Sequence, residues 1–151
     1  MFLTTLCYLE RDNQYLMLYR NSKKADISLG KYLGVGGKIE KGESPREACI
    51  REIKEETGLL ALDIKERGII TFNNSVYEDE YIFLYTCNDF SGEISECDEG
   101  DLVWVSKNEI LNLPLWPGDK YFLKHLIEDN KTYLDIKFNY EKDKLISYQI
   151  Q

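Results

Sequence analysis

The 151-residue sequence lacks the features that define several large classes of protein. No apolar run approaches the roughly 20 residues that a membrane-crossing helix needs, so we expect no membrane-spanning segment. The opening stretch MFLTTLCYLE is apolar but short and has no basic leader, which argues against a signal peptide and for a cytoplasmic protein. Internal repeats, low-complexity tracts and linkers are also missing, so residues 1–151 are predicted to form one domain.

Paired metal-binding cysteine and histidine residues are absent as well. The cysteines form no C-x-x-C pair, and the single histidine, His125, has no ligand partner nearby in the sequence. A structural zinc site is therefore not expected. We predict that His125 is a surface or packed residue and that the thiols are reduced and mostly buried, at Cys7, Cys49, Cys87 and Cys97.

Positive charge is in short supply. Asp and Glu number 27 against 19 Lys and Arg, which gives a formal net charge of −8. A protein that binds nucleic acid polymers needs a basic face, so that function is not expected. An anionic small molecule remains compatible with this charge, because a bound divalent cation reverses the sign of the local potential.

The pattern of apolar residues predicts an α/β or α+β fold with one mixed sheet. The predicted strands are residues 4–10, 14–20, 61–72, 77–87 and 102–105, followed by a hairpin that turns at 141–144. The predicted helices are residues 45–57, 107–112 and 117–129. Residues 21–31 are predicted to be a loop, and residues 88–100 an acidic loop, with a short strand inside it as the alternative.

Both ends of the central helix are marked in the sequence. Ser44 and Glu47 form a capping box, in which each side chain accepts a hydrogen bond from the backbone amide of the other residue. Pro45 occupies the first helical position, where its missing amide costs nothing. Gly58 suits the left-handed residue that ends a helix. The helix is therefore predicted over residues 45–57.

Three glutamates crowd one side of this helix. At about 100° per residue, Glu52, Glu55 and Glu56 fall within about 100° of one another. Each such pair costs a few tenths of a kcal/mol in an isolated helix, and more as the surroundings become less polar. A hard cation such as Mg²⁺, which binds carboxylates, carbonyls and water, removes this repulsion. An acidic face turned to solvent is the alternative interpretation.

The glycines before the helix favour a ligand site. Gly34, Gly36 and Gly37 allow backbone groups to approach a ligand closely, so a loop returning beside the helix can add a carbonyl to the carboxylates. Their spacing does not match G-x-G-x-x-G, and they lie too far from the helix start for phosphates to bind there. A dinucleotide-binding loop is therefore not predicted.

Together these residues match the Nudix box, G-x5-E-x7-R-E-U-x-E-E-x-G-U, in which U is apolar. The matching residues are Gly37, Glu43, Arg51, Glu52, Ile53, Glu55, Glu56, Gly58 and Leu59. The chain thus resembles the Nudix hydrolases, and among them the MutT-type nucleoside triphosphate diphosphatases that clear oxidised purine nucleotides. Further similarity lies in the strand ending at Arg20, in LGVGGK, in Asp98-Glu99 and in LWPGD at 115–119.

This resemblance implies a Nudix α/β/α sandwich with a mixed sheet and, as in bacterial members, a C-terminal β-hairpin. It implies hydrolysis of a nucleoside triphosphate such as 8-oxo-dGTP to the monophosphate and pyrophosphate, with Mg²⁺ as cofactor and Mn²⁺ as a substitute. Such chemistry needs charge neutralisation and an in-line water, which metal ions bridged by carboxylates provide. The expected partner is a small nucleotide, not a nucleic acid polymer or a membrane, and the expected state is a monomer or homodimer.

The resemblance also assigns residues to the site. The implied metal ligands are the carbonyl of Gly36 and the side chains of Glu52, Glu55, Glu56 and Glu99. These four glutamates are also the candidate catalytic residues, with Glu52, or else Glu99, orienting or deprotonating the attacking water. Glu43 and Arg51 are implied to hold loop and helix together as an ion pair.

The candidate substrate-binding residues are Arg20, Gly37, Lys38, Trp116 and Asp119. Arg20 and Lys38 are either phosphate contacts or ordinary surface charges. Trp116 either stacks on a purine or anchors the core. Asp119 either accepts hydrogen bonds from the edge of guanine or caps the last helix.

Two positions depart from the resemblance and leave the selectivity for 8-oxoguanine open. Gly118 stands where animal oxidised-purine enzymes have a second acid, and Leu33 stands where some members have an asparagine that reads the base. Two alternative functions follow: a pyrophosphatase for another nucleoside diphosphate derivative such as ADP-ribose, and a non-catalytic Nudix domain that binds nucleotide. The intact helix glutamates argue against the second alternative.

Overall fold

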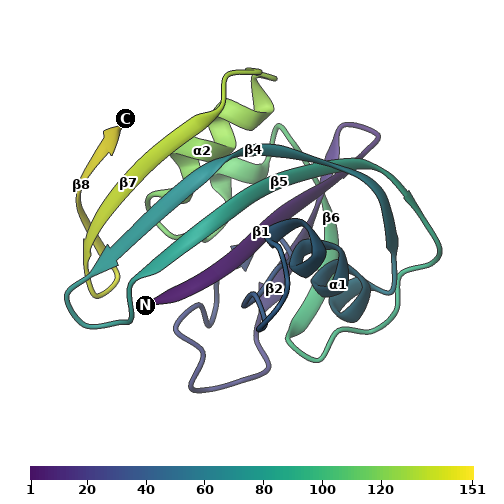
Figure 1. Cartoon of the computed structure of the whole chain (residues 1–151), viewed down its shortest axis with the longest axis horizontal. Coiled ribbons are helices and arrows are strands. Elements are labelled where there is room, and N and C mark those ends of the chain that lie inside the picture. Colours follow the sequence, from purple (N-terminus) through teal and green to yellow (C-terminus); the bar gives the residue numbers. More distant parts are fainter.

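The computed structural model describes residues 1–151, which form a sheet with helices on its two sides (Figure 1). The strands are β1 (Phe2–Arg11), β2 (Gln14–Arg20), β3 (Tyr32–Leu33), β4 (Leu60–Asn74), β5 (Glu80–Ser91), β6 (Gly100–Ser106), β7 (Leu134–Glu141) and β8 (Lys144–Ile150). The helices are α1 (Pro45–Thr57), α2 (Asp119–Ile127) and the short 3-10 helix η1 (Ile110–Asn112).

Strand β1 joins the two parts of the sheet. The larger part is mixed and has the order β1-β5-β4-β7-β8, in which β1 is parallel to β5 and β4 is parallel to β7. The smaller part is antiparallel and has β2 between β3 and β6. The two parts meet where β1 pairs with β2 at Glu10–Tyr15 and Arg11–Gln14, so the two strands diverge beyond their turn.

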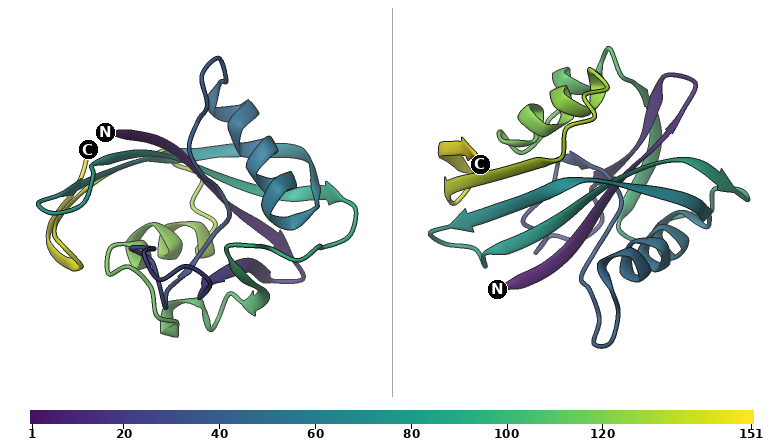
Figure 2. Two further views of the ribbon diagram at one scale, coloured as in Figure 1. Left: turned by 90° about the horizontal axis from the view of Figure 1, so that it is seen from below. Right: turned by 45° about the horizontal axis from the view of Figure 1, so that its top comes forward.

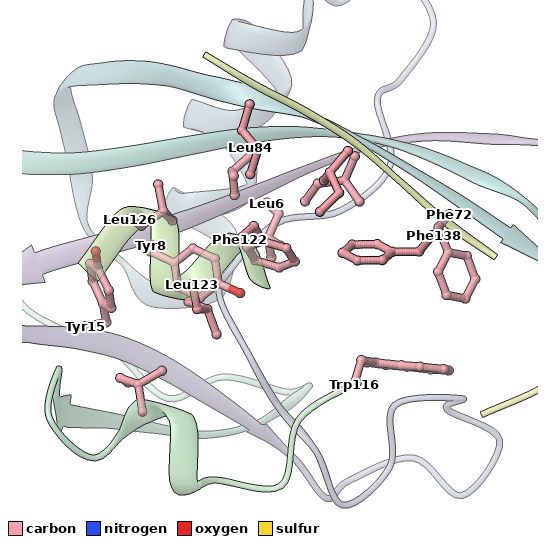
Figure 3. Packing of buried hydrophobic residues seen from close by; sticks show 14 of the residues in the cluster. Leu6, Tyr8, Tyr15, Phe72, Leu84, Trp116, Phe122, Leu123, Leu126 and Phe138 are labelled. Atoms are coloured by element: carbon pink, nitrogen blue, oxygen red, sulfur yellow. The ribbon is translucent and has the colours of Figure 1, made fainter. Parts of the chain in front are cut away.

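Helices α1 and α2 cover opposite sides of the mixed part of the sheet, as Figure 2 shows. Cys49 and Ile53 of α1 are fully buried in one core, which includes residues of β1 and β4. The other core lies on the side of α2, where Phe122 and Leu123 pack with Tyr8 of β1 (Figure 3). This arrangement confirms the predicted α/β/α sandwich with a mixed sheet and a C-terminal hairpin, β7–β8.

The ends of α1 form as the sequence predicts. The Glu47 amide donates to the Ser44 hydroxyl at 3.1 Å, and the Ser44 amide donates to a Glu47 carboxylate oxygen at 3.0 Å. Gly58 ends the helix with a φ of 81°. Local chemistry therefore fixes both the start and the end of the helix that carries the acidic residues.

Strand β5 was predicted over 77–87, and these bounds are wrong at both ends. The strand starts later, at Glu80, because the Asn74 side chain accepts from the amides of Val76 and Tyr77 and holds the preceding turn. It continues to Ser91, which pairs with Leu60 of the long strand β4. Pairing with a long neighbour thus extends β5 into the segment that was predicted to be a loop.

Other predicted boundaries also need correction. Helix α2 spans Asp119–Ile127 instead of 117–129, and the positive φ of Asp129 cannot continue it. The predicted helix over 107–112 is only the 3-10 turn η1. Strand β6 is longer than 102–105, because it pairs along the whole of β2. Strand β3, with only two residues, has no detectable pattern in the sequence.

The remaining global expectations concern cysteines and membranes. All the cysteines are free; Cys7, Cys49 and Cys87 are buried and Cys97 is partly buried. A ring nitrogen of His125 lies 2.8 Å from the carbonyl oxygen of Thr132. Neither helix has the length and apolar character that crossing a bilayer requires.

The capping box generates a stability prediction. Ser44→Ala removes the hydroxyl that accepts from the Glu47 amide, so we expect the unfolding free energy to fall by about 1 kcal/mol and Tm by about 2–4 °C. Thermal unfolding followed by circular dichroism measures both. Ser75→Ala, at an exposed serine whose side chain makes no hydrogen bond, is the matched control. Equal effects of the two substitutions would contradict a stabilising cap.

Candidate active site

The glycine segment lies between β1 and α1. The amide of Cys7 donates to the Val35 carbonyl at 2.7 Å, and the amide of Thr5 donates to the Gly37 carbonyl at 2.9 Å. Because backbone groups alternate along an extended chain, the peptide groups of Gly36 point away from β1. The Gly36 amide donates to Glu56 at 3.3 Å, and the Gly36 carbonyl has no hydrogen-bond partner.

Close approach to the backbone of β1 requires glycine at Gly36, and Gly37 lies against an acid of α1. A Cβ atom on Gly36 would lie 1.9 Å from the carbonyl oxygen of Thr5. A Cβ atom on Gly37 would lie 2.7 Å from the carboxyl carbon of Glu52. A side chain at Gly36 would separate the segment from β1, whereas a side chain at Gly37 would displace the Glu52 carboxylate.

Glu56 is the most buried acid of the site. It is 8% exposed, and its second carboxylate oxygen, Oε2, is buried without a hydrogen-bond partner. Burial and the neighbouring Glu52 charge raise the pKa of Glu56 to about 9, against the opposing hydrogen bond from Gly36. Without a cation, this carboxyl group is therefore protonated near neutral pH.

Arg51 binds the other acids of the box. Its guanidinium donates to both carboxylate oxygens of Glu43, at 2.7 and 2.9 Å, and holds the loop before α1 against the helix. It also donates to Glu52 at 2.8 Å and to Glu55 at 3.1 Å. The bonds from Arg51 lower the pKa of Glu43 to about 2, so this carboxylate is charged at neutral pH.

The acids do not form a preformed metal cage. No three His, Cys, Asp or Glu side chains of the structure converge on one point as metal ligands. Glu52 and Glu55 are held by Arg51, and the side chain of Glu55 is 59% exposed. The spacing of residues along the helix predicts a shared face, but it does not predict that an arginine side chain occupies the space between these carboxylates.

The residues nevertheless fit a divalent cation. One carboxylate oxygen of Glu56 is buried without a hydrogen-bond partner, and the Gly36 carbonyl oxygen has no partner either. The two residues are neighbours, because the Gly36 amide donates to the other carboxylate oxygen of Glu56. Glu52 lies beside them, as the effect of its charge on Glu56 shows. Oxygen atoms of this kind are the ligands that hard cations prefer.

Arg20 and Glu99 meet at the edge of the site. Arg20 ends β2 opposite Gly100, and its guanidinium lies 3.3 Å from Glu99 and 2.8 Å from Asp26. Lys23 also contacts Glu99, at 2.9 Å. Two cations thus hold Glu99, which makes no hydrogen bond with the acids of α1. Arg20 is nevertheless close enough to these acids to lower the pKa of Glu56.

Lys38, one of the two candidate phosphate contacts, lies beside Phe2 of β1. Its ammonium group lies 3.9 Å from the centroid of the Phe2 ring, and the side chain is exposed. Its backbone carbonyl accepts a hydrogen bond from Arg51 at 3.0 Å. Asp98, the neighbour of Glu99, is also exposed, and its carbonyl accepts from the Ser22 hydroxyl.

An apolar pocket lies on the α2 side of the sheet. Only three of its lining residues are polar: Ser28, Glu80 and Asp119. A neighbouring cavity of about 200 Å³ is lined by Arg20, Gly36 and Gly37, so it leads to the glycine segment. Six residues line both spaces: Leu6, Ile27, Ser28, Leu33, Glu80 and Ile82.

Trp116 belongs both to the core and to the wall of the pocket. It is 5% exposed and makes edge contacts with Phe72 and Tyr140, at centroid distances of 5.5 and 5.4 Å. Its indole N–H donates to the Ser28 hydroxyl at 3.0 Å. In Figure 3 the ring is seen nearly edge-on. A core anchor and a pocket wall are therefore compatible roles.

Asp119 does not cap the last helix. The N-cap of α2 is Gly118, and the helix has no side-chain cap. The Asp119 carboxyl instead lines the apolar pocket, where burial raises its pKa to about 8 and the charge of Lys31 opposes the rise. Near neutral pH this group can either donate or accept a hydrogen bond.

Gly118 and Leu33, the two positions at which the sequence departs from the pattern, both lie at the pocket or in contact with its wall. A Cβ atom on Gly118 would lie 2.8 Å from the Phe138 ring and 2.8 Å from the Tyr140 hydroxyl. That hydroxyl accepts a hydrogen bond from the Gly118 amide at 2.7 Å. The hairpin strand β7 therefore occupies the space that a second acid would need. Leu33 adds an apolar surface to the pocket.

Sequence reasoning missed three residues of the pocket. Glu80 comes from the start of β5, Ser28 from the loop before β3, and Tyr140 from β7. None of them belongs to a motif, and each reaches the pocket only through the pairing of distant strands. An acid at the start of an apolar strand, as at Glu80, is the one signal that the sequence offers.

Comparisons with known proteins agree with this geometry. The model of the NUDIX domain family matches residues 2–126. The Nudix hydrolase YvcI of Bacillus subtilis is 32% identical over 97% of this chain and 92% of its own length. The oxidized purine nucleoside triphosphate hydrolase of Mus musculus is 29% identical over 85% of this chain and 83% of its own. The crystal structure of a MutT protein from Bacillus halodurans superposes with a TM-score of 0.90 at 29% identity, covering 100% and 98% of the two chains.

The buried Asp119 generates a prediction for stability against pH. Its pKa rises from 3.8 to about 8 on folding, so the folded protein retains a proton that the unfolded chain loses in this range. The unfolding free energy should therefore decrease as the pH rises through this range. Asp119→Asn should reduce that decrease by at least about 1.4 kcal/mol, the equivalent of one pKa unit.

Urea unfolding between about pH 5 and pH 9 measures this effect. The raised pKa of Glu56 also makes the unfolding free energy fall with rising pH, and it does so equally in wild type and variant. The difference between the two pH profiles therefore isolates the contribution of Asp119. Asp63→Asn, at an exposed position of β4, is the control and should leave the pH profile unchanged. Parallel profiles of wild type and Asp119→Asn would show that the Asp119 carboxyl is hydrated.

Proposed function

The chain belongs to the NUDIX family and is a hydrolase of phosphoanhydride bonds, and on this premise we propose that it converts a purine nucleoside triphosphate to the monophosphate and pyrophosphate. The proposed preferred substrate is oxidised deoxyguanosine triphosphate, 8-oxo-dGTP, and the proposed cofactor is Mg²⁺. The observation that carries this proposal is the shared wall between two spaces. One is an apolar pocket that contains a tryptophan and an acid, and the other is a cavity that reaches the glycine segment beside the acids of α1.

The lining of this continuous space suits a nucleotide with its base and phosphates at opposite ends. The apolar pocket contains Trp116 and Asp119, and the adjoining cavity reaches Gly36 and Gly37 beside Glu52. An aromatic surface favours a planar base, whereas the glycine segment and the acids favour a polyphosphate that arrives with its cation. The shared walls allow one molecule to occupy both spaces.

Glu56, Glu52 and the Gly36 carbonyl are proposed to hold the metal, with Glu55 joining them when it leaves Arg51. Mg²⁺ bound there would neutralise phosphate charge and acidify a coordinated water. Glu52, or else Glu99, is proposed to orient or deprotonate the attacking water. Arg20, which lines the cavity beside Gly36, is proposed to bind phosphate oxygens.

Asp119 is proposed to read the base. Its carboxylate can accept from the N–H groups on the Watson–Crick edge of guanine, and its protonated form can donate to the base carbonyl. A pKa of about 8 makes both forms accessible near neutral pH. The relation to the mouse oxidised-purine hydrolase supports a purine substrate, although Gly118 and Leu33 leave fewer polar contacts for distinguishing 8-oxoguanine from guanine.

The test is a screen of pyrophosphate release with Mg²⁺ against oxidised and normal purine and pyrimidine triphosphates and ADP-ribose. We expect the highest kcat/KM for 8-oxo-dGTP, followed by dGTP. A strong preference for ADP-ribose over every triphosphate would overturn the substrate assignment. Nucleotide binding without turnover of any compound would instead identify a binding domain.

Glu56→Gln tests the metal site directly. Gln resembles the protonated carboxyl in size and charge, so the metal-free variant should fold with wild-type stability at neutral pH. It should lose its metal affinity and about a hundredfold or more in kcat, because it removes an ionisable oxygen ligand. Glu66→Gln, at an exposed acid of β4, is the control and should retain full activity. Wild-type turnover by the folded Glu56→Gln variant would remove Glu56 from the metal site.

A further inference from the structure

Glu80 stands where the apolar pocket meets the cavity that leads to the acids of α1. It lines both spaces, and the only other polar residue that does so is Ser28. The Ser28 hydroxyl already accepts from the indole N–H of Trp116. Of the two polar side chains at this junction, Glu80 therefore has more hydrogen-bond acceptor sites left for a ligand.

The surroundings of Glu80 are mostly apolar. As the first residue of β5, it lies between Phe2 of β1 and Phe72 of β4 in the sheet. One carboxylate oxygen accepts from the Thr4 hydroxyl at 3.1 Å, and this is its one hydrogen bond with the protein. Burial raises the pKa of Glu80, while the Thr4 bond and the charge of Lys38 oppose the rise.

The second carboxylate oxygen of Glu80 has no donor from the protein. A partly buried carboxylate with one hydrogen bond is stabilised by any ligand that supplies another donor. Phosphate oxygens would be repelled by its charge, so the triphosphate is directed toward Arg20, which also lines the cavity. The base has its own acid, Asp119, which lines only the apolar pocket.

We propose that Glu80 is a sugar-binding residue, which accepts a hydrogen bond from a ribose hydroxyl of the nucleotide. This inference rests on the proposed function, which assigns the base to the Trp116 pocket and the phosphates to the acids of α1. The sugar joins these two parts, and its hydroxyl groups are the donors that a carboxylate at the junction meets. Thr4 acts as a positioning residue that orients the carboxylate.

Binding of product-like nucleotides tests this proposal without requiring turnover. Calorimetry with 2′-deoxyguanosine monophosphate and its 2′,3′-dideoxy analogue compares ligands that differ by one sugar hydroxyl, and guanosine monophosphate adds the second hydroxyl. Wild type should bind at least one hydroxyl-bearing nucleotide about tenfold or more tightly than the dideoxy compound, as expected for a bond to a charged group. Glu80→Leu should abolish this preference and leave the dideoxy affinity unchanged.

Two further variants separate a sugar contact from a structural effect. Glu80→Gln keeps an acceptor oxygen and should retain part of the preference, whereas Glu78→Gln removes a nearby charge outside both cavities and should retain all of it. Thermal unfolding verifies that each variant is folded, and if Glu80→Leu is not, the Gln variant provides the test.

The outcomes distinguish this inference from the function on which it rests. Binding of guanine nucleotides with no preference for a sugar hydroxyl would refute the role of Glu80 and leave the proposed function standing. An equal loss of affinity for all nucleotides in the Glu80 variants would also refute it, because it would show a general effect on the pocket. No binding of any guanine nucleotide by wild type would refute both.

Discussion

The burial of Glu56 beside Glu52 is the constraint on which the rest of the site depends. Arg51 compensates Glu43, Glu52 and Glu55, but Glu56 receives only the amide of Gly36 and retains an oxygen without a partner. An uncompensated buried charge is costly, so the carboxyl group takes up a proton when no cation is present. A divalent cation bound at the site we propose would relieve the same cost and leave the carboxylate charged.

The fold keeps this acidic helix beside a pocket built from the opposite side of the sheet. Strand β1 holds the glycine segment through its backbone, and its Leu6 lines the pocket that Trp116 and Asp119 share. Phe138 and Tyr140 of β7 complete that pocket, although the family model matches only residues 2–126. The acids of α1 therefore lie within the family core, whereas part of the apolar pocket comes from the C-terminal hairpin that lies outside the matched region.

The sequence predicted features that depend on nearby residues. The Ser44–Glu47 box and Gly58 define α1 because capping is a local interaction, and the same short stretch carries the Nudix pattern. The positions of Glu80 and Tyr140 in the pocket depend on pairing between distant strands, which no local pattern encodes. Spacing along α1 places acids on one face but does not determine side-chain contacts. The hydrogen bonds from Arg51 to Glu52 and Glu55 were therefore not predicted.

The central claim is that a magnesium ion, brought with a polyphosphate, relieves the cost of burying the Glu56 charge beside the other acids of α1. A crystal structure of the protein with Mg²⁺ and a non-hydrolysable purine nucleoside triphosphate tests it most directly. The account predicts a metal ion that contacts Glu56 and the Gly36 carbonyl, with the base beside Trp116. A nucleotide bound with its metal elsewhere, and Glu56 still without a partner, would contradict it.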